Sequence, residues 1–200
     1  MKELNMTTID YYNQNVQTYI ERTKDFNVPH LLYPFVALLK PDAKILDAGC
    51  GSGRDSLLFQ KMGFQVLAID GAEEMVKHVS SLGIPAQKKL FEEISFENEF
   101  DAIWCCASLV HVKKENLPDV IARLERSLKP NGVLLVSFKM GHGEGFENGR
   151  YFHYLDESSM REYFANFTLL SLSITPSTLN QNQTTWIAGV FQVKKSLSGL

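Results

Sequence analysis

The sequence predicts an α/β fold, built on a seven-stranded, mostly parallel sheet with helices on both faces and an antiparallel C-terminal strand. Short apolar runs alternate five times with segments of helical periodicity, which is the pattern of parallel strands joined by crossover helices. The last two apolar runs have no helix between them, so they must pair antiparallel. With 200 residues, 44% hydrophobic and 22% charged, the chain can bury a core of its own.

Two helices are expected ahead of the alternating part. Residues 10–23 repeat aromatic and apolar side chains at helical spacing, and residues 30–39 form a second apolar segment. Pro41 ends this segment, because proline disfavours helical backbone in the residue before it. No repeat or linker divides the chain, so residues 1–200 are expected to form one domain.

The alternating part predicts the remaining elements in order. Strands are expected where short apolar runs are bounded by turn-forming residues, at 44–47, 65–70, 86–90, 101–107, 133–138, 167–174 and 186–193. Helices are expected where apolar residues recur three and four positions apart, at 55–62, 73–82, 117–128 and 157–166. The glycine-bearing segment 141–149 is expected to be a mobile loop, and the polar segment 176–185 to join the last two strands.

Charge and cysteine content exclude several classes of function. The net charge is −3 and no basic run exceeds two residues, so no nucleic-acid partner is expected. No apolar run is long enough to span a membrane, and the N-terminal residues lack the apolar segment of a signal peptide. Three cysteines, two of them adjacent, make a poor disulfide framework and lack the spacing of a metal site, so a cytoplasmic protein without a bound metal is predicted.

The strand at 44–47 runs directly into three alternating glycines, Gly49, Gly51 and Gly53, and then into a helix. Without Cβ atoms such a turn can adopt positive φ and lie flat against a ligand, while the first N–H groups of the helix remain free. In open α/β sheets this crevice is where ligands bind. A dinucleotide fingerprint requires its third glycine where Arg54 stands, which weakens the case for a nicotinamide cofactor.

From Asp47 to Gly53 the motif resembles that of the class I S-adenosylmethionine-dependent methyltransferases, and the resemblance extends over about residues 40–195. The pattern from Asp47 to Ser56 is most similar to the tellurite-resistance-type and related small-molecule methyltransferases. The resemblance implies a Rossmann-like core over residues 41–195 and S-adenosyl-L-methionine as cofactor. In it Asp47 orients the loop and the methionine end, the glycines pass beneath the cofactor, and Asp70 binds the ribose hydroxyls.

Further cofactor contacts follow from the same resemblance. The implied set lies beside the glycine motif, after the next three strands and on the N-terminal helix: Cys50, Arg54, Gly71, Met75, Leu90, Phe91, Cys106, Ala107, Tyr19 and Arg22. Met75 is equally interpretable as a core residue, and the Leu90-Phe91 pair lacks the acid that many relatives carry there. Residues 1–40 are expected to form a helical lid, because relatives fold a similar Tyr-rich helix over the cofactor.

A small-molecule acceptor is expected, methylated by in-line displacement driven mainly by proximity and orientation. The sequence lacks the Asn/Asp-Pro-Pro-Tyr/Phe and Pro-Cys motifs of enzymes that methylate nucleic acids. His111 and Arg150 are the catalytic candidates, although His111 could equally be structural. Lys139 and Arg150 could favour an anionic acceptor or could simply solvate a surface loop.

Two other functions stay open at this stage. A nicotinamide-dependent oxidoreductase would share the crevice and Asp70, and a non-catalytic module could bind S-adenosylmethionine without turnover. The sequence predicts neither the acceptor atom nor the oligomeric state.

Overall fold

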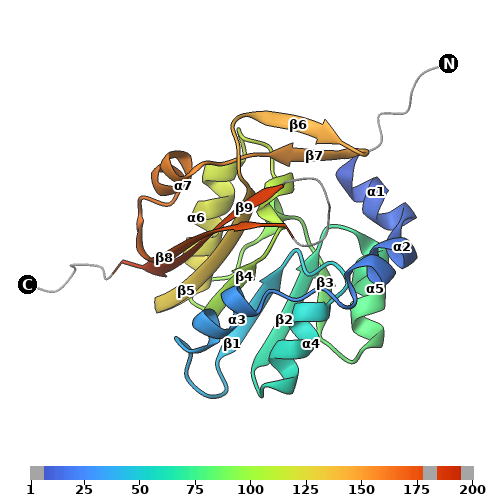
Figure 1. The fold of residues 1–200 in the computed structure, drawn as a ribbon. Helices are drawn as coiled ribbons and strands as arrows, with labels where there is room; N and C mark the ends of the chain where they lie inside the picture. The colour runs from blue at the N-terminus through green and yellow to red at the C-terminus, as the bar shows by residue number, and fades with distance from the viewer. Residues whose placement is uncertain (1–6, 178–183, 195–200) are drawn as a thin grey trace, which may run out of the picture.

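A computed structural model describes residues 7–177 and 184–194. Its main sheet has seven strands in the order β3-β2-β1-β4-β5-β9-β8 (Figure 1). The strands are β1 (Lys44–Ala48), β2 (Gln65–Asp70), β3 (Ala86–Lys88), β4 (Phe100–Cys105), β5 (Leu128–Lys139), β8 (Phe167–Pro176) and β9 (Thr185–Val193). The first five pair parallel, whereas β9 is antiparallel to both β5 and β8, so the predicted fold class is confirmed.

The connections between strands are mostly helical. The α-helices are α1 (Thr8–Gln14), α2 (Val16–Thr23), α3 (Pro29–Val36), α4 (Arg54–Lys61), α5 (Glu73–Ser81), α6 (Leu117–Ser127) and α7 (Glu157–Tyr163), with short 3-10 turns η1 (Phe91–Glu93) and η2 (Leu109–His111). Within the described ranges no helix is both long and apolar enough to cross a bilayer. All predicted helices after the N-terminal segment are present, with ends shifted by up to three residues.

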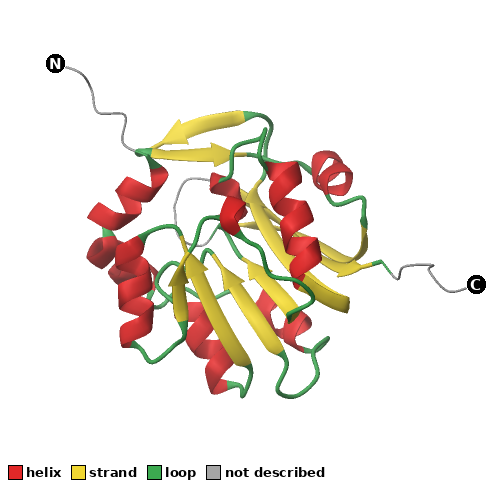
Figure 2. Cartoon of the chain, turned by 180° about the vertical axis from the view of Figure 1, so that it is seen from behind, coloured by secondary structure: helices red, strands yellow, loops and turns green. Residues whose placement is uncertain are grey.

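Alternation along the strands divides the core into two layers, one on each face of the sheet. On β4, Ile103 packs into the layer covered by α6 and α7, while Trp104 packs into the layer covered by α3, α4 and α5. The period of two in a strand sends neighbouring side chains to opposite faces, and a parallel sheet buried on both faces therefore has near-continuous apolar strands. Figure 2 shows helices on both sides of the sheet.

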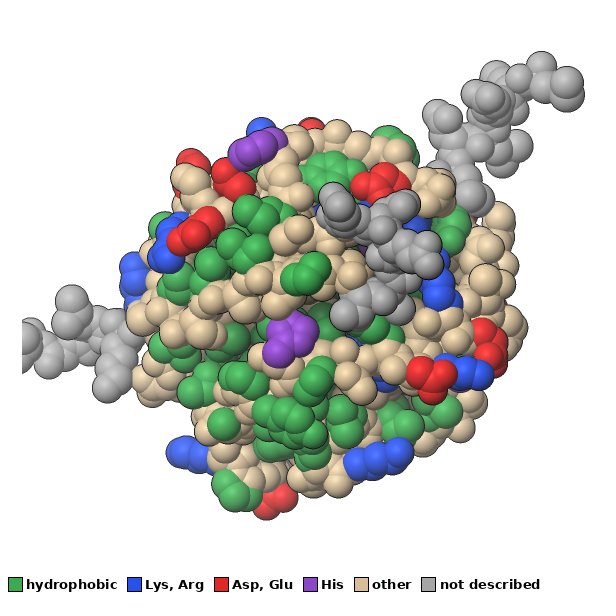
Figure 3. Space-filling model, in the orientation of Figure 1, with side chains coloured by type: hydrophobic (Ala, Val, Ile, Leu, Met, Phe, Trp, Pro, Cys, Tyr) green, Lys and Arg blue, Asp and Glu red, His purple; other side chains and the backbone are tan. Residues whose placement is uncertain are grey.

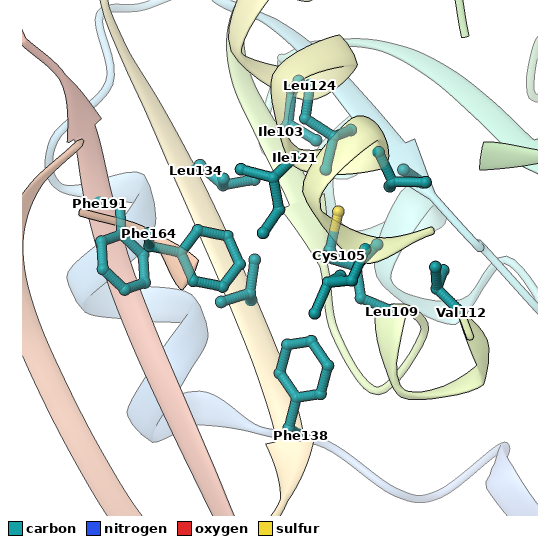
Figure 4. Packing of buried hydrophobic residues seen from close by; sticks show 14 of the residues in the cluster. Ile103, Cys105, Leu109, Val112, Ile121, Leu124, Leu134, Phe138, Phe164 and Phe191 are labelled. Atoms are coloured by element: carbon teal, nitrogen blue, oxygen red, sulfur yellow. The ribbon is translucent and has the colours of Figure 1, made fainter. Parts of the chain in front are cut away.

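The layer under α6 and α7 is shown in Figure 4. Ile121 and Leu124 of α6 face Ile103 and Leu134 of the sheet, which places the predicted apolar stripe of α6 against β4 and β5. Farther along, the Phe164 ring stacks on Phe191 of β9 with ring centroids 4.7 Å apart. This contact fixes the end of α7 against the antiparallel part of the sheet.

Two sequence predictions near the ligand edge are wrong. The helix expected over residues 10–23 is broken at Asn15, whose φ and ψ of −115° and 21° lie outside the helical region and separate α1 from α2. The segment expected to be a mobile loop contains a hairpin of β6 (Glu144–Glu147) and β7 (Arg150–His153). Its two-residue turn is Asn148-Gly149, both at positive φ as a type I′ turn requires.

The fifth strand also begins earlier than predicted. A turn was expected at residues 129–132, yet Leu128 already pairs with Phe100, and the register shifts before Ala102 pairs with Val133. Asn131, with φ of 64°, lies in this irregular stretch. The polar segment 176–185 lies largely outside the described residues.

Candidate functional site

The glycine motif forms the loop between β1 and α4 at the carboxyl edge of the sheet. Gly49, Gly51 and Gly53 have φ values of 79°, 51° and 72°, which side chains rarely tolerate. A Cβ at Gly49 would lie 2.4 Å from Cβ of Ser108, so that position also lacks space for a side chain. The loop follows β1, where neighbouring strands β2 and β4 lead in opposite directions along the sheet, which is the switch point where α/β sheets bind ligands.

Asp47 lies near the end of β1 beneath this loop and is 3% exposed. Its carboxylate accepts a hydrogen bond of 2.5 Å from the Ser56 hydroxyl of α4. Burial, followed by the charge of Asp55, raises the pKa of Asp47 to about 7. A buried acid therefore supports the loop from below.

Asp70 ends β2 and binds the loop through backbone donors. Its two carboxylate oxygens accept N–H bonds of 2.9 Å from Gly51 and 2.8 Å from Ala72. Burial nevertheless raises its pKa, against the lowering effect of these bonds. Each oxygen keeps a further lone pair, so the carboxylate can accept from a ligand hydroxyl while it holds the loop.

The residues implied for the adenosine end meet beside Gly71. A Cβ at Gly71 would lie 2.9 Å from Leu90 and 3.2 Å from Ile9 of α1, and a Cβ at Gly49 would lie 3.4 Å from the Phe91 ring. Met75 is fully buried in α5, as its core interpretation predicts. The structure thus brings Phe91 to the glycine loop and Leu90 to Gly71, which follows Asp70.

Arg54 begins α4 and is held by its neighbour Asp55, an acid that the sequence analysis did not identify. Two bonds of 2.7 and 2.8 Å join the guanidinium to the carboxylate, and the indole N–H of Trp104 donates to the same carboxylate over 2.9 Å. Hydrogen bonding and charge from Asp55 raise the pKa of Arg54 despite the opposing effect of burial. The sequence could not indicate this role of Asp55, because it depends on the buried indole of Trp104, which only the fold brings next to the carboxylate.

Beyond β4, the chain turns sharply at Cys106 and Ala107. Ala107 has φ of 54°, and its N–H donates to the Ser137 hydroxyl over 2.7 Å. Burial raises the pKa of the Cys106 thiol to about 12, so this thiol stays protonated. Across the described part of the chain, no three His, Cys, Asp or Glu side chains form a group suited to a metal ion.

The N-terminal helices cover the carboxyl edge. The Tyr19 ring of α2 would approach a Cβ at Gly51 to 3.2 Å, and the Arg22 guanidinium lies 5.5 Å from the centre of that ring. Asn13 of α1 accepts a bond of 3.1 Å from the Glu74 N–H at the start of α5. Tyr19 therefore lies against the glycine loop, and Arg22 lies beside the Tyr19 ring in the lining of the larger cavity described below.

A cavity of about 460 Å³ opens next to the loop, between α2, α3, β7 and the ends of the central strands. It is lined by aromatic, polar and basic residues, among them Tyr12, Tyr19, Arg22, Phe26, His30, Arg54, Cys106, Ala107, His111, Lys139, Arg150, Phe152 and Trp186. A second cavity of about 40 Å³ lies between Tyr19, Asp47, Gly49 and Arg54. Tyr19, Arg54 and Cys106 line both cavities.

His111 lies in the wall of the larger cavity with both ring nitrogens engaged. Nδ1 lies 2.7 Å from the Tyr151 carbonyl oxygen, which only accepts, so Nδ1 carries the proton. Nε2, 2.9 Å away, then accepts from the Tyr12 hydroxyl. Burial lowers the pKa of His111 to about 4, and the charges of Arg150 and Lys139 act in the same direction. The imidazole is therefore neutral near pH 7.

The hairpin β6–β7 brings two cations to the same wall. Lys139 forms an ion pair with Glu147, and its ammonium lies 3.7 Å from the centre of the Phe152 ring. The Arg150 guanidinium lies 4.9 Å from the centre of Tyr11 and 5.3 Å from that of Phe152. Both cations line the cavity, so the interpretation that they only solvate a surface loop is wrong.

The site lies at the switch point of an open α/β sheet and consists of the glycine loop, the buried acid Asp47 and the strand-end carboxylate of Asp70. This combination is typical of domains that bind a nucleotide-type cofactor. The larger cavity beside the loop gives this domain space for a second small molecule. Fold and site thus point to a class of two-substrate enzymes before any relative is considered.

Comparisons with known proteins identify the class further. Residues 45–132 match the family model of a methyltransferase domain. A putative methyltransferase of Bacillus subtilis, YqeM, is 38% identical over 109 residues, which cover 50% of this chain and 43% of that protein. The chain thus spans less than half the length of this curated relative.

Solved structures show the same fold. A SAM-dependent methyltransferase of Methanosarcina mazei superposes with a TM-score of 0.73 at 18% identity, over 82% of this chain and 99% of that one. The 1,6-didemethyltoxoflavin-N1-methyltransferase of Burkholderia thailandensis, solved with 1,6-didemethyltoxoflavin and S-adenosylhomocysteine, has a TM-score of 0.73 at 21% identity, over 92% and 88% of the two chains. Residues 45–132 thus match a methyltransferase domain in sequence, and the fold is the one that these methyltransferase structures share, in agreement with the resemblance of the glycine motif.

Proposed function

We propose that the chain binds S-adenosyl-L-methionine at the glycine loop and transfers its methyl group to a small molecule in the larger cavity. The observation that carries the proposal is the loop Asp47–Gly53 held by the strand-end carboxylate of Asp70, with the 460 Å³ cavity beside it. The matched family and the named relatives are methyltransferases, which favours this function over the oxidoreductase alternative.

The residues at the loop fit such a cofactor. The three glycines at positive φ leave no Cβ between the loop backbone and a ligand, and Asp70 retains lone pairs for the ribose hydroxyls. Leu90 and Phe91 would border the adenine, and the smaller cavity at Asp47 and Arg54 would take the methionine end. When bound, the sulfonium supplies an already activated methyl group.

The remaining predicted residues take supporting roles in this proposal. Cys50, Gly71, Met75 and the turn at Cys106 and Ala107 would shape the cofactor site through backbone and packing. Helices α1 and α2 would form the lid, with Tyr19 over the loop and Arg22 at the cavity. His111 would position the Tyr12 hydroxyl rather than take a proton, because both of its nitrogens are already engaged.

A small-molecule acceptor suits the surface and the cavity. Basic side chains do not gather into one patch on the face shown in Figure 3, so a nucleic-acid acceptor has no electrostatic support there. The cavity volume of about 460 Å³ lies in the range of small-molecule sites. We infer a cytoplasmic location from the three free cysteines, which suit a reducing compartment.

Calorimetric titration with S-adenosylhomocysteine tests the cofactor, with NADH titrated in parallel. Asp70→Asn removes the charge while keeping one acceptor oxygen, and is expected to weaken S-adenosylhomocysteine binding at least tenfold, since hydrogen bonds to charged groups contribute about 1.5–3 kcal/mol. Glu97→Gln is the matched control, because Glu97 is exposed and lies before β4, at the opposite edge of the sheet. Binding of NADH alone would refute the proposal.

A further inference from the structure

The larger cavity has an unbalanced set of charges. Its lining contains four cations, Arg22, Arg54, Lys139 and Arg150, and among the described lining residues no Asp or Glu. Arg54 is neutralised by Asp55 and Lys139 by Glu147, both from outside the lining. Within the described part of the chain, neither Arg22 nor Arg150 has a carboxylate within ion-pair distance. In that part of the chain Arg22 and Arg150 therefore lack a direct ion pair, and the charge of Glu147 acts on Arg150 only from beyond ion-pair distance.

Arg150 is the better placed of the two. Its guanidinium is held between aromatic rings, 4.9 Å from the centre of Tyr11 and 5.3 Å from that of Phe152. Its Nε atom is buried without a hydrogen-bond partner. A buried donor left unsatisfied is costly, and a guanidinium is suited to planar, two-point recognition of an anion. The Nε donor of this arginine is therefore available to an acceptor group that enters the cavity.

The shape of the lining favours a planar molecule. Tyr12, Phe26, Phe152 and Trp186 all contribute to the cavity wall. Aromatic rings stack or pack edge-on against other flat rings, and such contacts contribute about 0.5–1.5 kcal/mol beyond area burial. Flat apolar walls with a cation between them suit an aromatic anion better than a flexible aliphatic one.

Among the described residues, the buried part of the lining offers no group placed to remove a proton. His111 donates through Nδ1 and accepts through Nε2, and the pKa of the Cys106 thiol is raised to about 12 by burial. The other histidine of the lining, His30, is exposed on α3. An acceptor that enters already ionised supplies the electron pair for the new bond to the methyl carbon, the C–S pair stays on sulfur, and no proton has to be removed.

We propose that the cavity is an acceptor site for an aromatic anion, whose negative charge is held by Arg150 with help from Arg22. This inference rests on the proposed function for the position of the methyl donor, but the recognition of the anion does not require turnover. It assigns the unpaired cations a role in choosing the ionised form of the acceptor.

Binding of 4-nitrophenol tests the inference, because its phenol and phenolate forms differ in visible absorption. The protein, saturated with S-adenosylhomocysteine and in excess over the probe, is titrated across the ionisation range of the probe. The phenolate-to-phenol ratio of bound probe is expected to rise about tenfold over free probe, the effect of one unpaired cation about 6 Å away at an effective dielectric constant of about 40.

Arg150→Met is expected to abolish most of this rise, Arg150→Lys to restore part of it, and Arg22→Met to reduce it. Arg126→Met is the matched control, since Arg126 is an exposed arginine of α6 outside the cavity lining, and it should leave the rise unchanged. The circular dichroism spectrum confirms that each variant is folded, and affinity for S-adenosylhomocysteine confirms it for the variants at Arg150 and Arg126.

Equal preference for both forms, a rise that survives Arg150→Met, or no binding of the probe would each overturn the inference. Failure of the proposed function is seen separately, as absence of S-adenosylhomocysteine binding by the wild-type protein. The probe titration is then repeated without the cofactor product, so the anion preference is still decided.

Discussion

Replacing Asp47 by asparagine is expected to stabilise the unliganded protein above neutral pH. The carboxyl is 3% exposed, and burial raises its pKa from the ordinary 3.8 to about 7. Between these two values the folded state binds more protons than the unfolded state, so the free energy of unfolding falls as pH rises. Asparagine does not ionise, so the variant does not lose this part of the free energy of unfolding as pH rises.

The magnitude follows from the two pKa values. Each tenfold change in an ionisation equilibrium is worth about 1.4 kcal/mol, so the full penalty at high pH is about 4 kcal/mol. Between pH 5 and pH 8 the linkage relation gives a change of about 2–3 kcal/mol. The cost of placing the asparagine amide beside Ser56 is the same at both pH values. The change with pH in the stability difference between variant and wild type therefore reports the ionisation of Asp47 alone.

Urea unfolding at pH 5 and pH 8 measures this difference. The stability of Asp47→Asn relative to wild type should improve by about 2–3 kcal/mol from the lower to the higher pH. Asp101→Asn is the control of opposite sign, because hydrogen bonds from Lys129 and Lys44 lower the pKa of Asp101. A relative stability of Asp47→Asn that does not change with pH would show that the carboxyl is not strained by burial, and the reasoning would fail.

Two further predictions concern the loop and its support. Gly49→Ala should lower the free energy of unfolding by about 1–3 kcal/mol and abolish S-adenosylhomocysteine binding, because the new Cβ meets Ser108 at 2.4 Å and φ is 79°. Gly63→Ala is the control, since Gly63 has φ of 91° but no atom within 4 Å of the new Cβ. It should cost less stability and leave calorimetric binding intact. Trp104→Phe should cost about 1–3 kcal/mol in thermal or urea unfolding, because Asp55 loses the indole donor; an unchanged unfolding midpoint would contradict this role.

The fold was largely predictable because its strongest signals are local. The apolar stripe of α6 lies at positions 117, 120, 121 and 124 and determines a helix without long-range information. The run from Asp47 to Gly53 determines a turn in the same way. The hairpin β6–β7 was missed although Asn148-Gly149 is a strong turn signal, because its strands are short and the first is polar. The break at Asn15 depends on what α1 packs against, which periodicity does not reveal.

The residues of the candidate site were predictable only where the residue type and its place in the local pattern are enough to indicate the role. The glycine pattern and an acid at the end of each of two strands are visible in the sequence, and the structure brings them together at one edge of the sheet. The hydrogen-bond partners of Arg54 and His111 were not predictable. Arg54 is held by Asp55, whose carboxylate is held in turn by the buried indole of Trp104. His111 bonds to Tyr12, which is 99 residues away in the sequence. Such pairs arise from tertiary packing and leave no local pattern.

Helix α1 joins the two ends of the site mechanically. Asn13 holds the start of α5 on the nucleotide side, while the Thr8 hydroxyl accepts a bond of 2.9 Å from the Tyr151 N–H on the hairpin side. A helix of seven residues moves as one piece, so loosening it at one end disturbs its contacts at the other. We therefore expect the two ligands to influence one another's affinity, and by thermodynamic reciprocity each must alter the other's binding by the same factor.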